Sequence, residues 1–204
     1  MSIKARLFDQ FRQPRGPLGI LAGRIMSKRS SNQQRSAWTV ELLNLHPGDR
    51  VLELGYGPGL GIEAVLAHLP AGTLVGLDHS DTMRKMATKR IRAAHPEAHP
   101  DLRIGDAQAL PGDIGVFDKI FSCNVWLFWE DPVAVFENLR EHLAQGGTVA
   151  VTHLPRPGQA TREASLTAAA RITEQLTQAG YSGIRKELLE VDRVPAVCIL
   201  AKQP

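Results

Sequence analysis

From residue 50 onward, short apolar runs alternate with longer stretches whose apolar residues recur at helical spacing. Strands separated by helical stretches of 10 to 15 residues predict βαβ units, and therefore a mostly parallel, doubly wound α/β sheet with helices on both faces. Two final strand-like runs are joined by only three residues, so we predict that they pair as an antiparallel hairpin. The seven predicted strands are 51–54, 73–77, 102–104, 117–123, 148–153, 184–191 and 195–201, and the helices among them are 61–68, 81–94, 132–143 and 161–179.

The residues ahead of the first strand have a different pattern. Apolar residues at helical spacing on both sides of a proline and glycine break predict two short amphipathic helices, and a third helix is predicted from about Asn32 to Leu43. We therefore divide the chain into an N-terminal helical cap, residues 1–45, and one α/β domain, residues 46–204. A chain of 204 residues is long enough to bury such a core.

Charge separates the same two parts. Residues 1–36 carry eight lysines and arginines and one acid, a charge of +7, and since the whole chain has +3, the remaining 168 residues carry −4. A basic amphipathic leader on an acidic body indicates an anionic partner such as a membrane surface, whereas no nucleic-acid-binding module is recognisable. No apolar run approaches the roughly 18 residues of a membrane span, and no secretory signal is evident. We expect a cytoplasmic protein, with peripheral attachment to the inner membrane as an open alternative.

The strongest chemical signal is the run Glu53-Leu54-Gly55-Tyr56-Gly57-Pro58-Gly59, which directly follows the first predicted strand and precedes a helix. Glycines allow a sharp turn and a close approach of the backbone to a ligand. In doubly wound sheets, ligands bind at the carboxyl ends of the strands, where this turn is predicted to lie. A dinucleotide-binding turn would have glycine or alanine where Leu60 stands and would not be preceded by an acid.

The same run resembles motif I of the class I S-adenosylmethionine (SAM)-dependent methyltransferases. This resemblance implies a Rossmann-like domain in which the glycine turn passes the methionine portion of the cofactor. It also implies that the acid orients the loop or the cofactor's amino group. The implied residues are Glu53, Gly55, Tyr56, Gly57 and Gly59.

Two later positions favour an adenosine ligand. Asp78 ends the second predicted strand, where a carboxylate can accept both ribose hydroxyls, a geometry that NAD enzymes share. Gly105-Asp106-Ala107 resembles the family's adenine site, in which the acid accepts from the exocyclic amine and the next amide donates to the ring, although such a turn is common by itself. His79 either lies along the adenine or is a surface residue.

The segment from Phe117 to Pro132 resembles the fourth strand and following loop of small-molecule methyltransferases, which lie between the sulfonium and the acceptor. This implies that Asn124 is near the cofactor. Trp126 and Trp129 are candidates for the acceptor side, because aromatic faces attract sulfonium and ammonium groups, but core packing is the commoner role of tryptophan. The segment has no Asn/Asp-Pro-Pro-aromatic motif of the kind found in enzymes that methylate nucleic-acid bases or glutamine.

A general base is needed only for some acceptors. His153, at the end of the fifth predicted strand, is the candidate base for a phenol or thiol, or else it simply packs at the strand terminus. An amine acceptor needs no strong base, since holding the reactants in line in a dry site can supply much of the acceleration. The other histidines and the two cysteines lack metal-ligand spacing, so we expect no metal.

These features predict SAM-dependent methyl transfer to a small-molecule or lipid acceptor. The basic leader and the chain length resemble small bacterial phospholipid N-methyltransferases, which implies an amine of the phosphatidylethanolamine type as one acceptor. The leader either covers the pocket as a lid or contacts anionic lipid. Two other functions stay open at this point, a SAM-binding regulatory protein without turnover and a nicotinamide-dependent oxidoreductase.

Overall fold

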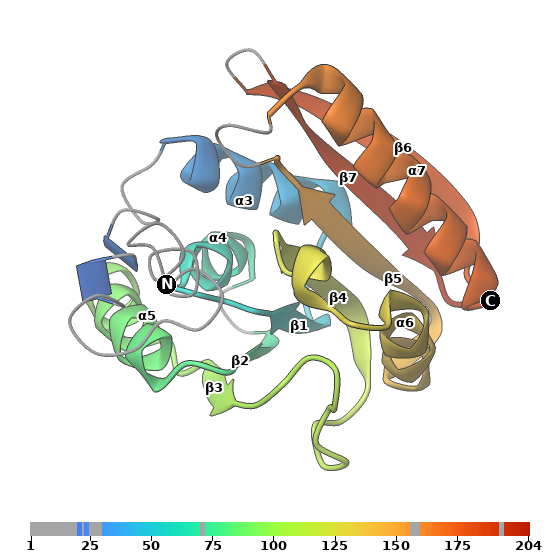
Figure 1. Cartoon of the computed structure of the whole chain (residues 1–204). Helices are drawn as coiled ribbons and strands as arrows, with labels where there is room; N and C mark the ends of the chain where they lie inside the picture. The colour runs from blue at the N-terminus through green and yellow to red at the C-terminus, as the bar shows by residue number, and fades with distance from the viewer. Residues whose placement is uncertain (1–19, 22, 25–29, 70–71, 156–159, 192–193) are drawn as a thin grey trace.

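The computed structural model describes residues 20–21, 23–24, 30–69, 72–155, 160–191 and 194–204. Seven strands form one sheet in the order β3-β2-β1-β4-β5-β7-β6 (Figure 1). Strands β1 to β5 pair in parallel, and β7 runs antiparallel to both β5 and β6. This confirms the predicted sheet and its C-terminal hairpin. The strands are β1 Arg50–Leu54, β2 Thr73–Asp78, β3 Asp101–Ile104, β4 Phe117–Cys123, β5 Leu143–His153, β6 Ser182–Val191 and β7 Val194–Lys202.

The helices begin where the sequence offers a capping side chain. Ser80, Asp131 and Thr161 each accept a hydrogen bond from the backbone amide three residues later, which satisfies one of the free donors at a helix N-terminus. The helices are α3 Ser30–Leu43, α4 Leu60–His68, α5 Asp81–Ala94, α6 Pro132–Glu141, α7 Arg162–Gln178 and the short 3-10 helix η1 Trp126–Phe128.

Because side chains along each strand alternate between the two faces of the sheet, the apolar residues form two separate cores. In β1, Leu52 and Leu54 belong to the core that also contains residues of α6 and α7, whereas Val51 belongs to the core beneath α3, α4 and α5. Figure 1 shows α3, α4 and α5 on one side of the sheet and α6 and α7 on the other. Because successive side chains of a strand point to opposite faces, Glu53 lies on the same face as Val51, toward α3 and α4.

Helix α3 places polar residues against the sheet. Arg35, Ser36 and Thr39 are buried together with Val40 and Leu43, although an amphipathic helix would bury its apolar stripe alone. Thr39 finds a partner in Thr152 of β5, with 2.7 Å between the two hydroxyl oxygens. The buried polar face of α3 therefore points to the carboxyl ends of the central strands.

The predicted N-terminal helices lie largely outside the described residues. Of the leader, residues 20–21 and 23–24 are described and helical, and Ile20 and Leu21 are exposed. A Cβ on Gly23 would press against Met83 and Met86, so this part of the leader lies against α5. In the described part of the chain, no helix is both long enough and apolar enough to cross a membrane.

Candidate active site

The glycine turn after β1 is the sharp turn that the sequence predicted. Gly55, Gly57 and Gly59 have φ angles of 67°, 50° and 85°, a region that residues with a Cβ rarely occupy. A Cβ on Gly59 would stand 2.9 Å from the Cβ of Ala87 in α5, so this glycine lets α4 begin close to α5. A Cβ on Gly57 would meet no atom of the described residues within 4 Å, so in this part of the structure open space adjoins the turn at that position.

Asp78 at the end of β2 fixes this turn. The residue is 6% exposed, its Oδ2 accepts from the amide of Gly57 at 2.8 Å, and its Oδ1 accepts from the amide of Ser80 at 2.9 Å. Burial raises the pKa of the carboxyl, while these two hydrogen bonds and the nearby His79 lower it. The imidazole Nδ1 of His79 lies 4.0 Å from Oδ1, with a side chain that is 44% exposed. A carboxylate has about four acceptor positions, so Asp78 can hold the turn and still accept from a ligand.

Glu53 is a buried acid below the turn. The side chain is 2% exposed and a Cβ on Gly61 would overlap its carboxyl group, so the glycine at position 61 makes room for it. Burial, and next the charge of Asp78, raise the pKa of Glu53 to about 8, against the opposing effects of the Ile62 amide and of Arg35. Among the described residues, no group forms a hydrogen bond to its Oε2.

Arg35 brings a positive charge to the same place and was not predicted. It is 6% exposed, its Nη1 donates to Oδ1 of Asn32 at 3.0 Å, and its Nε has no hydrogen-bond partner in the described part of the chain. Buried charged groups normally have all their hydrogen bonds satisfied. A buried carboxyl group and a buried guanidinium, each with one atom that lacks a hydrogen-bond partner, therefore lie next to the glycine turn. This pair suits a ligand that has both an ammonium and a carboxylate group.

The third predicted site, after β3, has the form of an ordinary turn. Asp106 is exposed, its Oδ1 accepts from the amide of Gln108 at 2.9 Å, and its carbonyl accepts from the amide of Ala109 at 3.1 Å. Ala107 is buried in the core.

The phenol of Tyr56 is also buried and donates to the carbonyl of Arg103 at 3.3 Å, so any ligand contact of Tyr56 would come from its backbone.

Asn124 links the ends of two strands. It has a φ of 60°, and its side-chain amide both donates to the carbonyl of Leu154 at 3.2 Å and accepts from the amide of Leu154 at 2.7 Å. The side chain of the next residue, Val125, lies so close to Gly55 that a Cβ on this glycine would overlap it. The turn after β1 and the ends of β4 and β5 are therefore in contact.

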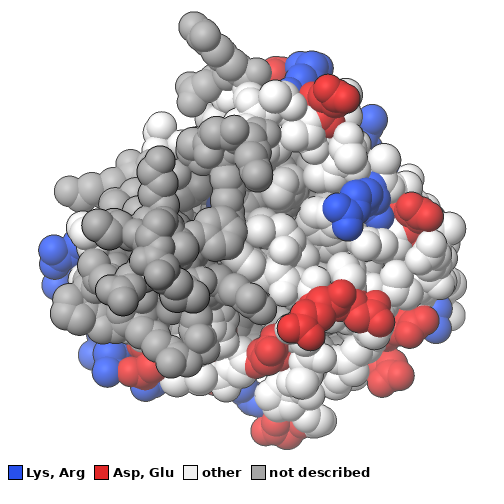
Figure 2. Space-filling model, viewed as in Figure 1, with Lys and Arg blue, Asp and Glu red and all other residues white. Residues whose placement is uncertain are grey.

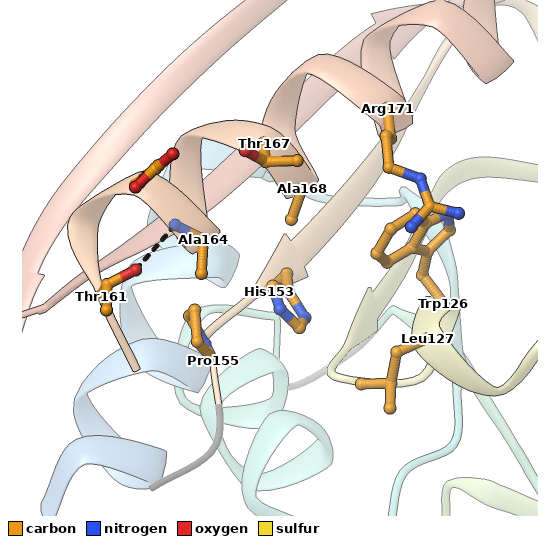
Figure 3. A pocket seen from close by; sticks show the side chains of 10 residues that line it. Trp126, Leu127, His153, Pro155, Thr161, Ala164, Thr167, Ala168 and Arg171 are labelled. Carbon is orange, nitrogen blue, oxygen red and sulfur yellow. Dashed lines mark hydrogen bonds between the residues drawn. The ribbon is translucent and has the colours of Figure 1, made fainter. Parts of the chain in front are cut away.

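A cavity of about 500 Å³ opens beside these strand ends (Figure 3). Trp126 lines one end of it: its indole Nε1 donates to Oε1 of Gln175 at 2.7 Å, and its ring meets that of His153 edge-on at 5.8 Å between centroids. The guanidinium of Arg171 lies over the same indole, 5.5 Å from its centroid. The lining residues are Trp126, Leu127, His153, Pro155, Thr161, Glu163, Ala164, Thr167, Ala168 and Arg171.

The structure thus brings Trp126 and His153 together but separates them from Trp129. Trp129 is not among the lining residues, because its ring packs edge-on against Phe136 in the core, with 5.3 Å between centroids. Arg171 and Gln175 of α7 were not predicted, since nothing in the local sequence of that helix distinguishes them from surface residues. Within the described ranges, no three His, Cys, Asp or Glu side chains gather as a metal site would require.

On the face of the molecule that Figure 2 shows, the charged side chains form separate groups. Figure 2 shows a largely uncharged area beside the residues drawn in grey, with a basic group on one side and a band of acidic side chains on the other. The buried polar groups at the glycine turn and the mainly apolar cavity are the two halves of the candidate site.

Comparison with known proteins agrees with this arrangement. A family model described as a methyltransferase domain matches residues 51–147. The chain is 28% identical over 185 residues to the uncharacterized methyltransferase YdaC of Bacillus subtilis, covering 91% of this chain and 99% of that protein. It is 38% identical over 84 residues to the protein-L-isoaspartate O-methyltransferase of Rhodopseudomonas palustris, but this match spans only 38% of that enzyme's length and 41% of this chain.

A solved structure shows the same fold. The magnesium protoporphyrin IX methyltransferase of Synechocystis PCC 6803, crystallised with bound SAM, superposes with a TM-score of 0.67 at 19% identity, covering 84% of this chain and 79% of that one. The domain match, the relatives and the fold agree with one another. Together they support a class I SAM-dependent methyltransferase.

Proposed function

We propose that this methyltransferase binds SAM at the glycine turn and transfers its methyl group to a small-molecule acceptor in the Trp126 cavity. The observation that carries the proposal is the contact between the two halves. Val125, which meets Gly55 of the turn, directly precedes Trp126, and Leu154, which Asn124 holds, directly follows His153. A ligand in the turn and an acceptor in the cavity are thereby brought to the same strand ends.

The residues of the turn fit the cofactor. Glu53 offers a carboxyl oxygen without a partner to the ammonium group, and Arg35 offers a free Nε–H to the carboxylate. Asp78 has acceptor positions left for the ribose hydroxyls, and the open space at Gly57 allows close approach of the ligand. When bound, SAM supplies an electrophilic methyl group on a sulfonium. Asp106, Ala107 and His79 keep their proposed places along the adenine.

On the acceptor side, His153 is the proposed general base for an acceptor that carries a phenol or thiol. Its ring lies at the cavity wall against Trp126, within the space that an acceptor would occupy. A cavity of about 500 Å³ accommodates a small molecule or the headgroup of a lipid such as phosphatidylethanolamine. Calorimetric titration with SAM and with S-adenosylhomocysteine tests cofactor binding, with NAD⁺ as the control ligand.

Turnover is tested separately from binding. We expect S-adenosylhomocysteine to be released when the enzyme and SAM are incubated with small-molecule extracts, and mass spectrometry identifies the compound that gains a methyl group. Tight SAM binding without any methylated product would favour a regulatory protein instead. Binding of NAD⁺ in place of SAM would favour an oxidoreductase and overturn the proposal.

For the leader we propose, as a second function, reversible contact of a cytoplasmic enzyme with the anionic face of a membrane. Residues 1–36 carry +7, and without the buried Arg35 they still carry +6. This charge supports the proposal, because each basic residue near an anionic surface contributes about 1 kcal/mol of attraction. The protein should co-sediment with anionic but not with zwitterionic vesicles, and roughly 0.5 M NaCl should release it.

A matched pair of variants separates membrane contact from a lid. Replacing Arg24, Lys28 and Arg29 with Gln should reduce vesicle binding and leave SAM affinity nearly unchanged. The control replaces the exposed residues Lys89, Arg92 and Lys202 with Gln, which removes the same charge from the body. Equal sedimentation of the two variants, or no sedimentation of the unmodified protein, would leave the leader as a pocket cover.

A further inference from the structure

The arginine of the cavity has an unusual position. The guanidinium of Arg171 lies over the Trp126 indole, 5.5 Å from its centroid, and it forms no ion pair with any carboxylate of the residues that the structure describes. A cation-π contact does not use the guanidinium's N–H groups as hydrogen-bond donors, and these groups can bind a carboxylate in a bidentate fashion. A cation with free donors therefore borders the cavity.

The ring beneath Arg171 is fixed by the same helix. Gln175, one turn further along α7, accepts the indole N–H of Trp126 at 2.7 Å, and His153 meets the indole edge-on. Figure 3 shows Arg171 next to the Trp126 ring, with His153 on the cavity side. Because Trp126 is held from two sides, it holds the guanidinium at one place, and this reduces the ordering cost of binding an anion.

The cavity is also polarised along α7. Glu163, at the first turn of α7, lines the same cavity eight residues before Arg171. At 1.5 Å per residue the two positions are about 12 Å apart along the helix axis. An anionic group is attracted at the Arg171 end and repelled at the Glu163 end, so the charges set the orientation of the bound molecule. Between them the wall is largely apolar and includes Leu127, Pro155 and Ala168.

From these observations we infer that the methyl acceptor is a small carboxylic acid with an apolar body, whose carboxylate binds Arg171. The acid group lies over the Trp126 end of the cavity, and the body lies along the apolar wall beside His153. This inference rests on the proposed function and adds the substrate class and the residue that selects it.

Calorimetry on the enzyme loaded with S-adenosylhomocysteine tests the inference. The probes are 4-hydroxyphenylacetate, 4-hydroxycinnamate, 3-phenylpropionate and hexanoate, each compared with its primary amide, which has nearly the same shape but no charge. We expect at least one acid to bind about 10- to 100-fold more tightly than its amide, as a charge-assisted bidentate contact implies. In Arg171→Gln this preference should disappear, while the affinity for S-adenosylhomocysteine should not change.

The control variant is Arg162→Gln. Arg162 lies on the same helix but is paired with Glu190 at 2.7 Å and does not line the cavity, so its loss should leave the preference for the acid intact. Circular dichroism checks that both variants are folded. Equal binding of acids and amides, binding of no acid, or a preference that survives Arg171→Gln would overturn the inference. Failure of the unmodified enzyme to bind S-adenosylhomocysteine would instead overturn the proposed function.

Discussion

The buried carboxyl of Glu53 makes stability depend on pH in a direction that can be measured. Its pKa is about 8 in the folded chain and 4.5 in the reference state, so between these values the folded chain holds a proton that the unfolded chain has lost. Stability therefore falls as the pH rises through this interval, by about 1.4 kcal/mol per unit and by about 5 kcal/mol in all. Below pH 4.5 both states are protonated, and above pH 8 neither is.

Glu53→Gln removes this effect with little change of shape, because the Gln carbonyl can still accept from the Ile62 amide. Urea unfolding at pH 4.5, 6 and 8.5 should show a variant about as stable as the unmodified protein at the lowest pH and increasingly more stable above it. The control Glu41→Gln changes an exposed acid of α3 and should show no such trend. A difference that stays constant with pH, or that favours the unmodified protein at pH 8.5, would refute the reasoning.

The same pKa predicts proton release on binding. A SAM ammonium group next to Glu53 favours the ionised carboxylate. Binding at pH 7 should therefore release close to one proton, seen as a binding enthalpy that varies with the ionisation enthalpy of the buffer. In Glu53→Gln the enthalpy should be the same in every buffer, and SAM should bind more weakly.

Three further substitutions test the strand ends. Asp78→Ala should weaken SAM binding by about 1.5 to 3 kcal/mol in calorimetry, since it removes acceptors for the ribose and for Gly57; unchanged affinity would exclude Asp78 from the site. Gly57→Val should abolish SAM binding with a nearly native circular dichroism spectrum, because the branched side chain enters the open space at a φ of 50°; normal binding would contradict our placement of the turn. Asn124→Ala should lower the free energy of unfolding by about 1 to 3 kcal/mol in urea, because it leaves both polar backbone groups of Leu154 without this partner; a neutral effect would show that water replaces the link.

The fold could be predicted because its strands and helices differ in local pattern. The strand boundaries were less accurate: β5 begins at Leu143, five residues before its predicted start, and the preceding helix ends at Glu141. Gln145-Gly146-Gly147 reads locally as a loop, but Leu143 is buried opposite Phe117 of β4, and this pairing extends the strand. Sheet pairing of this kind depends on a neighbour 26 residues away, which a local pattern does not contain.

For the two tryptophans of the acceptor segment, residue spacing alone was not enough to predict which ring lines the cavity. Trp126 and Trp129 are three residues apart, which in a continued 3-10 helix would place them on the same side. Trp126 begins η1, but Trp129 follows it with extended backbone angles, φ −72° and ψ 135°. The chain turns between them, so one ring lines the cavity and the other packs on Phe136 in the core.

The predictable and unpredictable parts of the site differ in how they are assembled. Gly57 and Asp78 belong to turns at the ends of adjacent parallel strands, and the topology alone brings them together. Arg35 and Arg171 come from helices on opposite faces of the sheet, and they reach the strand ends only because each helix packs there by contacts that its own sequence does not reveal. The part of the proposed cofactor site that lies on the turns therefore follows from sequence spacing, whereas the contributions of Arg35 and Arg171 depend on how α3 and α7 pack.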